Sequence, residues 1–191
     1  MRPIILASAS PRRQELLKNL GLEFEVQVSD VDENLEENIS SGQLVEKLAE
    51  RKAAAVALIR TQGLVIGADT IVVLGDKPLG KPTNREEAVQ MLSNLQGKSH
   101  EVFTGLAVID ASTGQRVVTH QVTEVNFKTL TKDQIERYVD TGEPMDKAGG
   151  YAVQGLASIF IDSIRGCYFS VVGLPISKLA DALRMFGVEI V

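Results

Sequence analysis

The stretch that decides the fold is Leu6-Ala7-Ser8-Ala9-Ser10-Pro11-Arg12-Arg13. The apolar run Ile4-Ile5-Leu6, which it overlaps, predicts a buried strand. Ser10 followed by Pro11 is typical of a helix start, because serine is a good N-cap and proline suits the first helical position. Leucines at 16, 17 and 20 then give a helical apolar face, and Gly21 stands where a helix ends. The stretch therefore predicts a strand, a tight loop and a helix.

Arg12 and Arg13 occupy the first turn of this helix, where the helix dipole makes each positive charge unfavourable by about 0.3–1 kcal/mol. A bound anion would reverse that sign. Free backbone amides, the hydroxyls of Ser8 and Ser10 and the two guanidinium groups together suit a phosphate. The alternative is a solvated helix start with both arginines pointing outward. Because two arginines follow Ser-x-Ser-Pro, the phosphate site is favoured over the solvated helix start.

Composition excludes several classes of function. A chain of 191 residues is long enough for one domain, or a two-lobed one, with a sizeable core. The net charge of −5 argues against non-specific binding to nucleic acid or to an anionic membrane, so any basic site is local. The single cysteine, Cys167, excludes an internal disulfide and fits a reducing cytoplasm. We expect no membrane span and no signal peptide, because Arg2 leads directly into a short strand and a charged helix.

The rest of the chain shows strand and helix patterns separated by turn residues. Strands are expected at residues 22–28, 64–66, 71–74, 100–110, 115–127 and 159–161, of which 100–110 and 115–127 form a hairpin. Helices are expected at residues 42–60, at 84–95 with Asn84 at the start, at 132–141 with Thr131 as the cap, and after Pro175. For the helix at 42–60 we expect Ser41 as the cap, with Leu44, Leu48 and Ala55 on the inner side.

Asp69 lies in Gly67-Ala68-Asp69-Thr70, between two apolar strand runs. Burying a carboxylate costs free energy unless it is paired, hydrogen-bonded or bound to a metal. Asp69 is therefore a candidate for a chemical role. The alternative is a structural one, in which it accepts backbone amides at a bend. Lys81, in Gly80-Lys81-Pro82, is held extended by the proline that follows, so its ammonium group can point into a cleft.

Other polar groups carry no clear signal by themselves. The carboxylates between residues 30 and 37, Glu33 among them, are typical of a solvated loop, and Lys52 is typical of a solvated helix residue. The segment 146–155 contains three glycines among charged and amide groups. It fits either backbone passing close to a ligand or an ordinary surface loop. Neither His100 nor His120 has metal-ligand spacing, and Cys167 has no nearby base, so we expect no thiol nucleophile.

Four motifs together resemble the Maf family of nucleoside triphosphate pyrophosphatases, over essentially the whole chain. They are Ser8-Ala9-Ser10-Pro11-Arg12-Arg13, Gly67-Ala68-Asp69-Thr70, Gly80-Lys81-Pro82, and Asp146-Lys147-Ala148-Gly149-Gly150-Tyr151 with Gln154-Gly155. The resemblance implies an α/β fold of the inosine-triphosphatase-like kind, with a long twisted mixed sheet, helices on its faces and two lobes around a central cleft, in one domain over residues 1–191. It also implies a divalent metal (Mg, Mn or Co), a homodimer and a cytoplasmic enzyme.

This family hydrolyses a nucleoside triphosphate between the α- and β-phosphates. By resemblance, the phosphate-binding residues are Ser8, Ser10 and Arg13, and the residues that neutralise the triphosphate and its leaving group are Lys52 and Lys81. The resemblance also assigns Glu33 and Asp69 to a metal such as Mg²⁺ or Mn²⁺, which prefers one or two carboxylates together with phosphate oxygens and waters. The resemblance further implies that Asp69 accepts the proton from the attacking water.

Arg12, Thr70 and Gln154 match the branch of the family that acts on dTTP and UTP. The branch that acts on 7-methyl-GTP has an aromatic residue, glutamine and glutamate at these positions. The neutral amide of Gln154 offers a donor and acceptors to a thymine or uracil edge. The alternative is that Gln154 hydrogen-bonds its own glycine-rich loop.

Two other functions compete with pyrophosphatase activity. One is a nucleotide-binding regulator of septum formation or cell division with little turnover. The other is a phosphatase that removes the terminal phosphate. Release of pyrophosphate distinguishes a pyrophosphatase from both.

Overall fold

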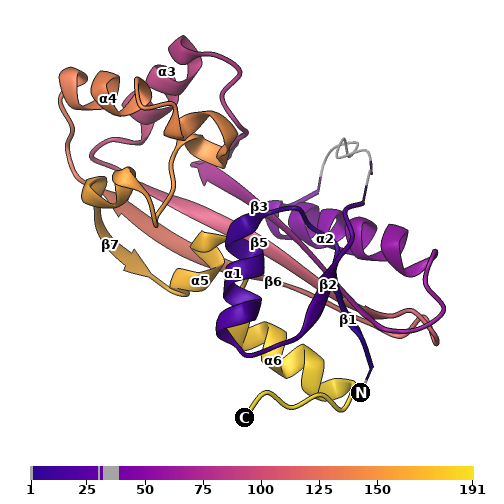
Figure 1. Ribbon diagram of the computed structural model, residues 1–191. Helices are drawn as coiled ribbons and strands as arrows, with labels where there is room; N and C mark the ends of the chain where they lie inside the picture. The colour runs from indigo at the N-terminus through magenta and orange to yellow at the C-terminus, as the bar shows by residue number, and fades with distance from the viewer. Residues whose placement is uncertain (1, 30, 32–38) are drawn as a thin grey trace. The chain divides into compact units, whose positions relative to one another are not determined.

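The computed structural model describes residues 2–29, 31 and 39–191. Seven strands in these residues form one mixed sheet in the order β2-β1-β3-β5-β6-β7, with β4 paired to β3 outside this path (Figure 1). The strands are β1 Ile4–Leu6, β2 Phe24–Val26, β3 Leu64–Leu74, β4 Lys77–Leu79, β5 Ser99–Asp110, β6 Arg116–Phe127 and β7 Ile161–Arg165. β1 is parallel to β2 and β3, whereas β3–β4 and β6–β7 are antiparallel.

Helices accompany this sheet along the described chain. They are α1 Pro11–Asn19, α2 Ser41–Ala57, α3 Arg85–Leu95, α4 Lys132–Val139, α5 Tyr168–Val172 and α6 Ile176–Met185, with the 3₁₀ turns η1 Glu143–Asp146, η2 Ala148–Gly150 and η3 Leu156–Phe160. A mixed sheet with helices confirms the expected α/β class. None of the helices described is long and apolar enough to cross a membrane.

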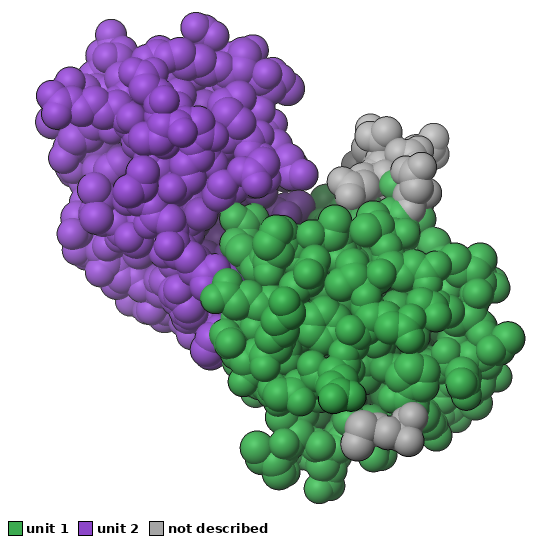
Figure 2. Space-filling view, viewed as in Figure 1, with its two compact units in different colours: residues 1–69, 104–121, 173–191 green, residues 70–103, 122–172 purple. Residues whose placement is uncertain are grey.

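The chain divides into two compact units, coloured separately in Figure 2. Unit 1 comprises Met1–Asp69, Thr104–Gln121 and Gly173–Val191, and unit 2 comprises Thr70–Phe103 and Val122–Val172. The strands β3, β5 and β6 contribute residues to both units. A single two-lobed domain over residues 1–191 stays a prediction.

In unit 1, α2 packs directly on one face of the sheet, because glycines leave room beneath it. A Cβ atom on Gly67 would lie 2.2 Å from the carbonyl oxygen of Ala49, and one on Gly105 would lie 2.0 Å from that of Val45. Side chains alternate along a strand, so odd-numbered residues of β3 face this helix. The buried side chains shared by this face and α2 are Ile5, Ala7, Ala49, Ala53, Val56, Val65, Ala107 and Ile109. Any side chain larger than hydrogen at these glycines would push α2 away from the sheet.

The core of unit 2 is built around aromatic rings. Tyr151 contacts Phe127 edge to face, and Phe160 does the same with Tyr138, at ring-centroid distances of 4.8 and 5.2 Å. Nε2 of His100 lies 2.7 Å from the Tyr151 hydroxyl. Burial lowers the pKa of His100 to about 4. This histidine is therefore a neutral core residue, in agreement with the absence of metal-ligand spacing.

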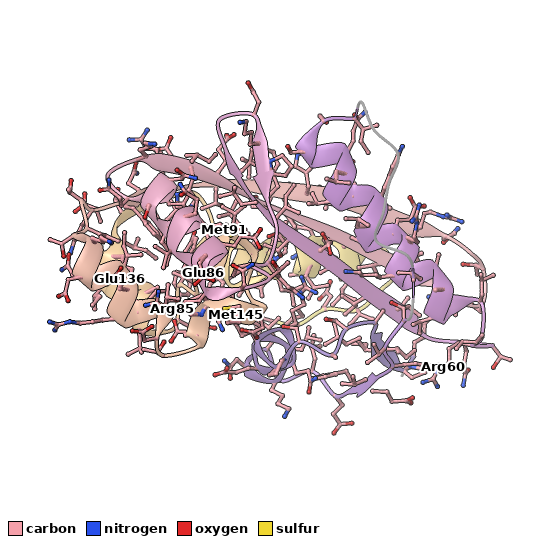
Figure 3. The ribbon with its side chains drawn as sticks, turned by 90° about the horizontal axis from the view of Figure 1, so that it is seen from above. Arg60, Arg85, Glu86, Met91, Glu136 and Met145 are labelled. Atoms are coloured by element: carbon pink, nitrogen blue, oxygen red, sulfur yellow. The ribbon has the colours of Figure 1, made fainter. Side chains whose placement is uncertain are left out.

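The helices α3 and α4 of unit 2 pack side by side and are joined by an ion pair. Nη2 of Arg85, on α3, lies 2.8 Å from Oδ1 of Asp140, the C-cap of α4. Figure 3 shows Arg85 and Glu136 where the two helices meet. Both helix starts agree with the sequence, since Asn84 accepts a hydrogen bond from the Glu87 amide and Thr131 accepts one from the Gln134 amide.

Three expectations about the elements are wrong. The strand expected at 22–28 spans only Phe24–Val26, because β2 is an edge strand paired with the three-residue β1. The cap of α2 is Ser40 rather than Ser41, and its inner face includes Val45, Leu48, Ala49, Ala53 and Val56, whereas Leu44 and Ala55 are half-buried. The strand expected at 159–161 is mostly the 3₁₀ turn η3, and β7 begins only at Ile161.

Candidate active site

The loop between β1 and α1 brings Ser8 and Arg13 together within unit 1. Nη1 of Arg13 donates to Oγ of Ser8 at 3.1 Å, and Nε donates to the carbonyl oxygen of Gly173 at 2.8 Å. Oγ of Ser8 also accepts from the Ser10 amide at 3.2 Å. These bonds hold the Arg13 guanidinium against the protein. The alternative in which both arginines point into solvent is therefore wrong for Arg13.

The start of α1 collects positive charge. Ser10 occupies the N-cap position, but its side chain makes no capping hydrogen bond. The first turn contains no acidic residue, and it does contain Arg12 and Arg13. The first amides of a helix have no acceptor within it, and they carry the positive end of the helix dipole. Together these groups suit an anion.

Asp69 and Lys52 form a buried ion pair within unit 1. Nζ of Lys52, on α2, lies 2.6 Å from Oδ1 of Asp69, on β3, and the two side chains are only 13% and 12% exposed. Asp69, like the other odd-numbered residues of β3, faces α2. Gly67 has no side chain, so α2 lies close to the strand. The sequence context of Lys52 alone suggested a solvated helix residue, and the ion pair shows that this interpretation is wrong. The pairing also explains how a carboxylate is tolerated between two apolar strand runs.

The expected metal ligands are Glu33 and Asp69. Glu33 lies outside the described residues. Within residues 2–29, 31 and 39–191, no group of three or more His, Cys, Asp or Glu side chains is placed to hold a metal ion. Asp69 supplies one carboxylate, and Mg²⁺ often takes only one or two from the protein, with phosphate oxygens and waters completing its shell. The described residues form no all-protein cage, and a metal shared with a phosphate ligand stays a prediction.

Three expected site residues belong to unit 2. Thr70 follows Asp69 directly in β3 and is half-buried. Lys81 is exposed just after β4, and Gln154 is exposed between η2 and η3. Their convergence with the residues of unit 1 on one substrate stays a prediction.

The glycine-rich segment 146–155 is not an ordinary surface loop, since it is buried from Gly149 to Val153. Gly149 and Gly150 have φ angles of 70° and 73°, which favour glycine. A Cβ atom on Gly149 would lie 3.0 Å from the side chain of Val72, and its amide donates to the Gly80 carbonyl at 3.0 Å. The positive φ and the contact with Val72 therefore account for Gly149, and the positive φ accounts for Gly150.

The sequence did not single out Glu143, yet its carboxylate joins three parts of unit 2. It accepts hydrogen bonds from the Tyr138 hydroxyl and from the amides of Leu156 and Ala157. A glutamate before a proline at the start of a short turn gives no local signal of such a role.

A family model described as a Maf-like protein matches residues 3–186. The chain belongs to the Maf family. It is 54% identical over 190 residues to a dTTP/UTP pyrophosphatase of Pelotomaculum thermopropionicum, with 100% of both chains covered. It is also 50% identical over 197 residues to a dTTP/UTP pyrophosphatase of Acetivibrio thermocellus, which covers 100% of this chain and 98% of that one. The family predicted from the four motifs is thereby confirmed.

Among solved structures, a HAM1 protein from Coxiella burnetii aligns with 66% of this chain and 73% of its own, at a TM-score of 0.44 and 20% identity. This likeness is low.

Proposed function

We propose that this chain is a nucleoside triphosphate pyrophosphatase that hydrolyses dTTP and UTP to the monophosphate and pyrophosphate. The observation that carries the proposal is its full-length similarity to Maf relatives that bear the name dTTP/UTP pyrophosphatase. A regulator that only binds a nucleotide is less favoured, because it has no use for a carboxylate held in place beside an ammonium group, as Asp69 is by Lys52.

In this proposal, phosphate oxygens bind at the start of α1, to Ser8, Ser10 and Arg13. The bonds from Arg13 to Ser8 and Gly173 support this role, because they fix the guanidinium before a ligand arrives. A helix N-terminus supplies further donors aimed at the same anion. The ammonium group of the exposed Lys81 neutralises negative charge on the leaving pyrophosphate.

Asp69 is the proposed acceptor of the proton from the attacking water. The bond from Lys52 engages Oδ1 of Asp69, and the proposal assigns Oδ2 to the attacking water and the cation. A divalent cation (Mg, Mn or Co) held by Asp69 and Glu33 would neutralise charge on the triphosphate.

Base preference is assigned to Arg12, Thr70 and Gln154, and the exposed position of Gln154 supports its availability to a ligand. A polar contact to the base can discriminate strongly, because a wrong base leaves buried groups unpaired. We also infer a cytoplasmic homodimer. The family resemblance supports this inference, and the single cysteine fits a reducing compartment.

The test is a comparison of kcat/KM for dTTP, UTP, CTP and 7-methyl-GTP, each with Mg²⁺ and Mn²⁺. We expect the wild type to prefer dTTP and UTP, and the variant Arg12→Trp/Thr70→Gln/Gln154→Glu to shift toward 7-methyl-GTP. Glu15→Gln, on the exposed side of α1, is the control. A wild type that prefers 7-methyl-GTP, or a triple variant with the wild-type ratio, would contradict the assignment.

A further inference from the structure

Glu143 ties α4 to the start of η3 within unit 2. It follows Gly142, which adopts a left-handed conformation at φ 76°. Oε1 of Glu143 accepts from the Tyr138 hydroxyl at 3.0 Å and, at 3.5 Å, from the Ala157 amide, while Oε2 accepts from the Leu156 amide at 3.0 Å. A carboxylate is suited to this place, because it has only acceptors to offer to three donors.

The same carboxylate leaves no room for a side chain at Gly155. A Cβ atom at this position would lie 2.2 Å from Oε1 and 2.5 Å from the carboxyl carbon of Glu143. The backbone of Gly155 is extended, with φ −98° and ψ −159°, so its conformation alone does not demand glycine. Close contact with Glu143 is what requires it.

Glu143 is itself held from a second side. Nζ of Lys147 donates to the backbone carbonyl of Glu143 at 2.7 Å and to Oδ1 of Asp146 at 2.6 Å, and the Lys147 side chain is only 13% exposed. Burial, with Glu143 as the hydrogen-bond acceptor, raises the pKa of Tyr138, so its hydroxyl stays protonated and remains a donor. The Glu143 carboxylate therefore accepts three hydrogen bonds, and Lys147 holds the turn on which it stands.

Gln154 lies between two fixed stretches of backbone. On its N-terminal side, Tyr151, Ala152 and Val153 are buried, and on its C-terminal side the Glu143 carboxylate holds residues 155–157. The Gln154 side chain is the exposed group between them. A side chain that selects a ligand by hydrogen bonds works only when its backbone is held in a defined place.

We propose that Glu143 is a positioning residue for base selection: it fixes the backbone on which Gln154 presents its amide. This inference rests on the proposed function, in which Gln154 contacts the base. Glu143 itself touches no substrate. Its loss should therefore change the preference among bases and leave the hydrolytic step nearly intact.

The first measurement is the ratio of kcat/KM for UTP to that for CTP in Glu143→Gln, which replaces one acceptor oxygen by a donor. We expect the ratio to fall by about tenfold, the size of effect that one lost hydrogen bond produces, with kcat for UTP little changed. In a Gln154→Ala background, Glu143→Gln should cause no further fall. Glu136→Gln, on the neighbouring helix α4, is the matched control and should keep the wild-type ratio.

The second measurement does not depend on activity. Gly155→Ala should lower the melting temperature of the otherwise wild-type protein, and should lower it far less when Glu143→Ala has removed the carboxylate. An equal loss in both backgrounds would overturn the proposed contact. An unchanged UTP:CTP ratio in Glu143→Gln, or a fall that persists without Gln154, would overturn the positioning role. A wild type with no preference for UTP would refute the proposed function, and the positioning role with it, even where the contact itself is verified.

Discussion

Replacing Lys52 by methionine should destabilise unit 1 strongly, because it leaves the Asp69 carboxylate buried without its ammonium partner. The two side chains are 13% and 12% exposed, and their charged atoms are 2.6 Å apart. Removing one partner of a buried ion pair costs about 3–5 kcal/mol, whereas replacing both partners together is often close to neutral. We therefore expect Lys52→Met to lower the free energy of unfolding by about 3 kcal/mol. The double variant Lys52→Met/Asp69→Asn should recover at least half of that loss.

The assay is urea denaturation at neutral pH with EDTA present, so that a bound metal does not mask the effect. Lys47→Met is the control, because Lys47 lies on the same helix and is exposed. If Lys52→Met loses no more stability than Lys47→Met, the pair is solvated and does not contribute to the stability of unit 1. A double variant whose loss equals the sum of the two single losses would show the same.

Three further predictions concern the site and the core. Asp69→Asn should lower kcat by at least about a hundredfold with an unchanged circular dichroism spectrum, and a near-normal rate would exclude Asp69 as the base. Arg13→Ala should raise KM for UTP far more than Lys18→Ala does, and equal kinetic losses would indicate a general effect of charge. His100 has a pKa of about 4 when folded and 6.5 when exposed, so the unfolded state binds more protons between these values. Stability should therefore fall by about 3 kcal/mol as the pH drops from 6.5 to 4, and a pH series of urea denaturations should show a flatter slope for His100→Gln.

Local signals in the sequence predicted the elements that local interactions stabilise. Asn84 and Thr131 cap their helices as expected, and the motif around Ser8 and Arg13 does form a strand, a loop and a helix. The strand expected at 159–161 was wrong because a short apolar run fits a strand and a turn of helix equally well.

The pairing of Lys52 with Asp69 could not be predicted from the residues around either one. It depends on how closely α2 approaches the sheet, and that approach is set by Gly67 and Gly105 on two different strands. The family resemblance placed Lys52 in the site, but it did not supply this partner. The contacts of Glu143 could not be predicted for a similar reason, since its hydrogen-bond donors lie on α4 and η3.

The proposed reaction cleaves the bond between the α- and β-phosphates, and the products formed from UTP show which bond is broken. Purified protein incubated with UTP and Mg²⁺ or Mn²⁺ should yield UMP and pyrophosphate in equal amounts, and Asp69→Asn should form both at least about a hundredfold more slowly. Formation of UDP and orthophosphate would instead identify a terminal phosphatase and exclude cleavage between the α- and β-phosphates. Tight binding of UTP without turnover would exclude it equally.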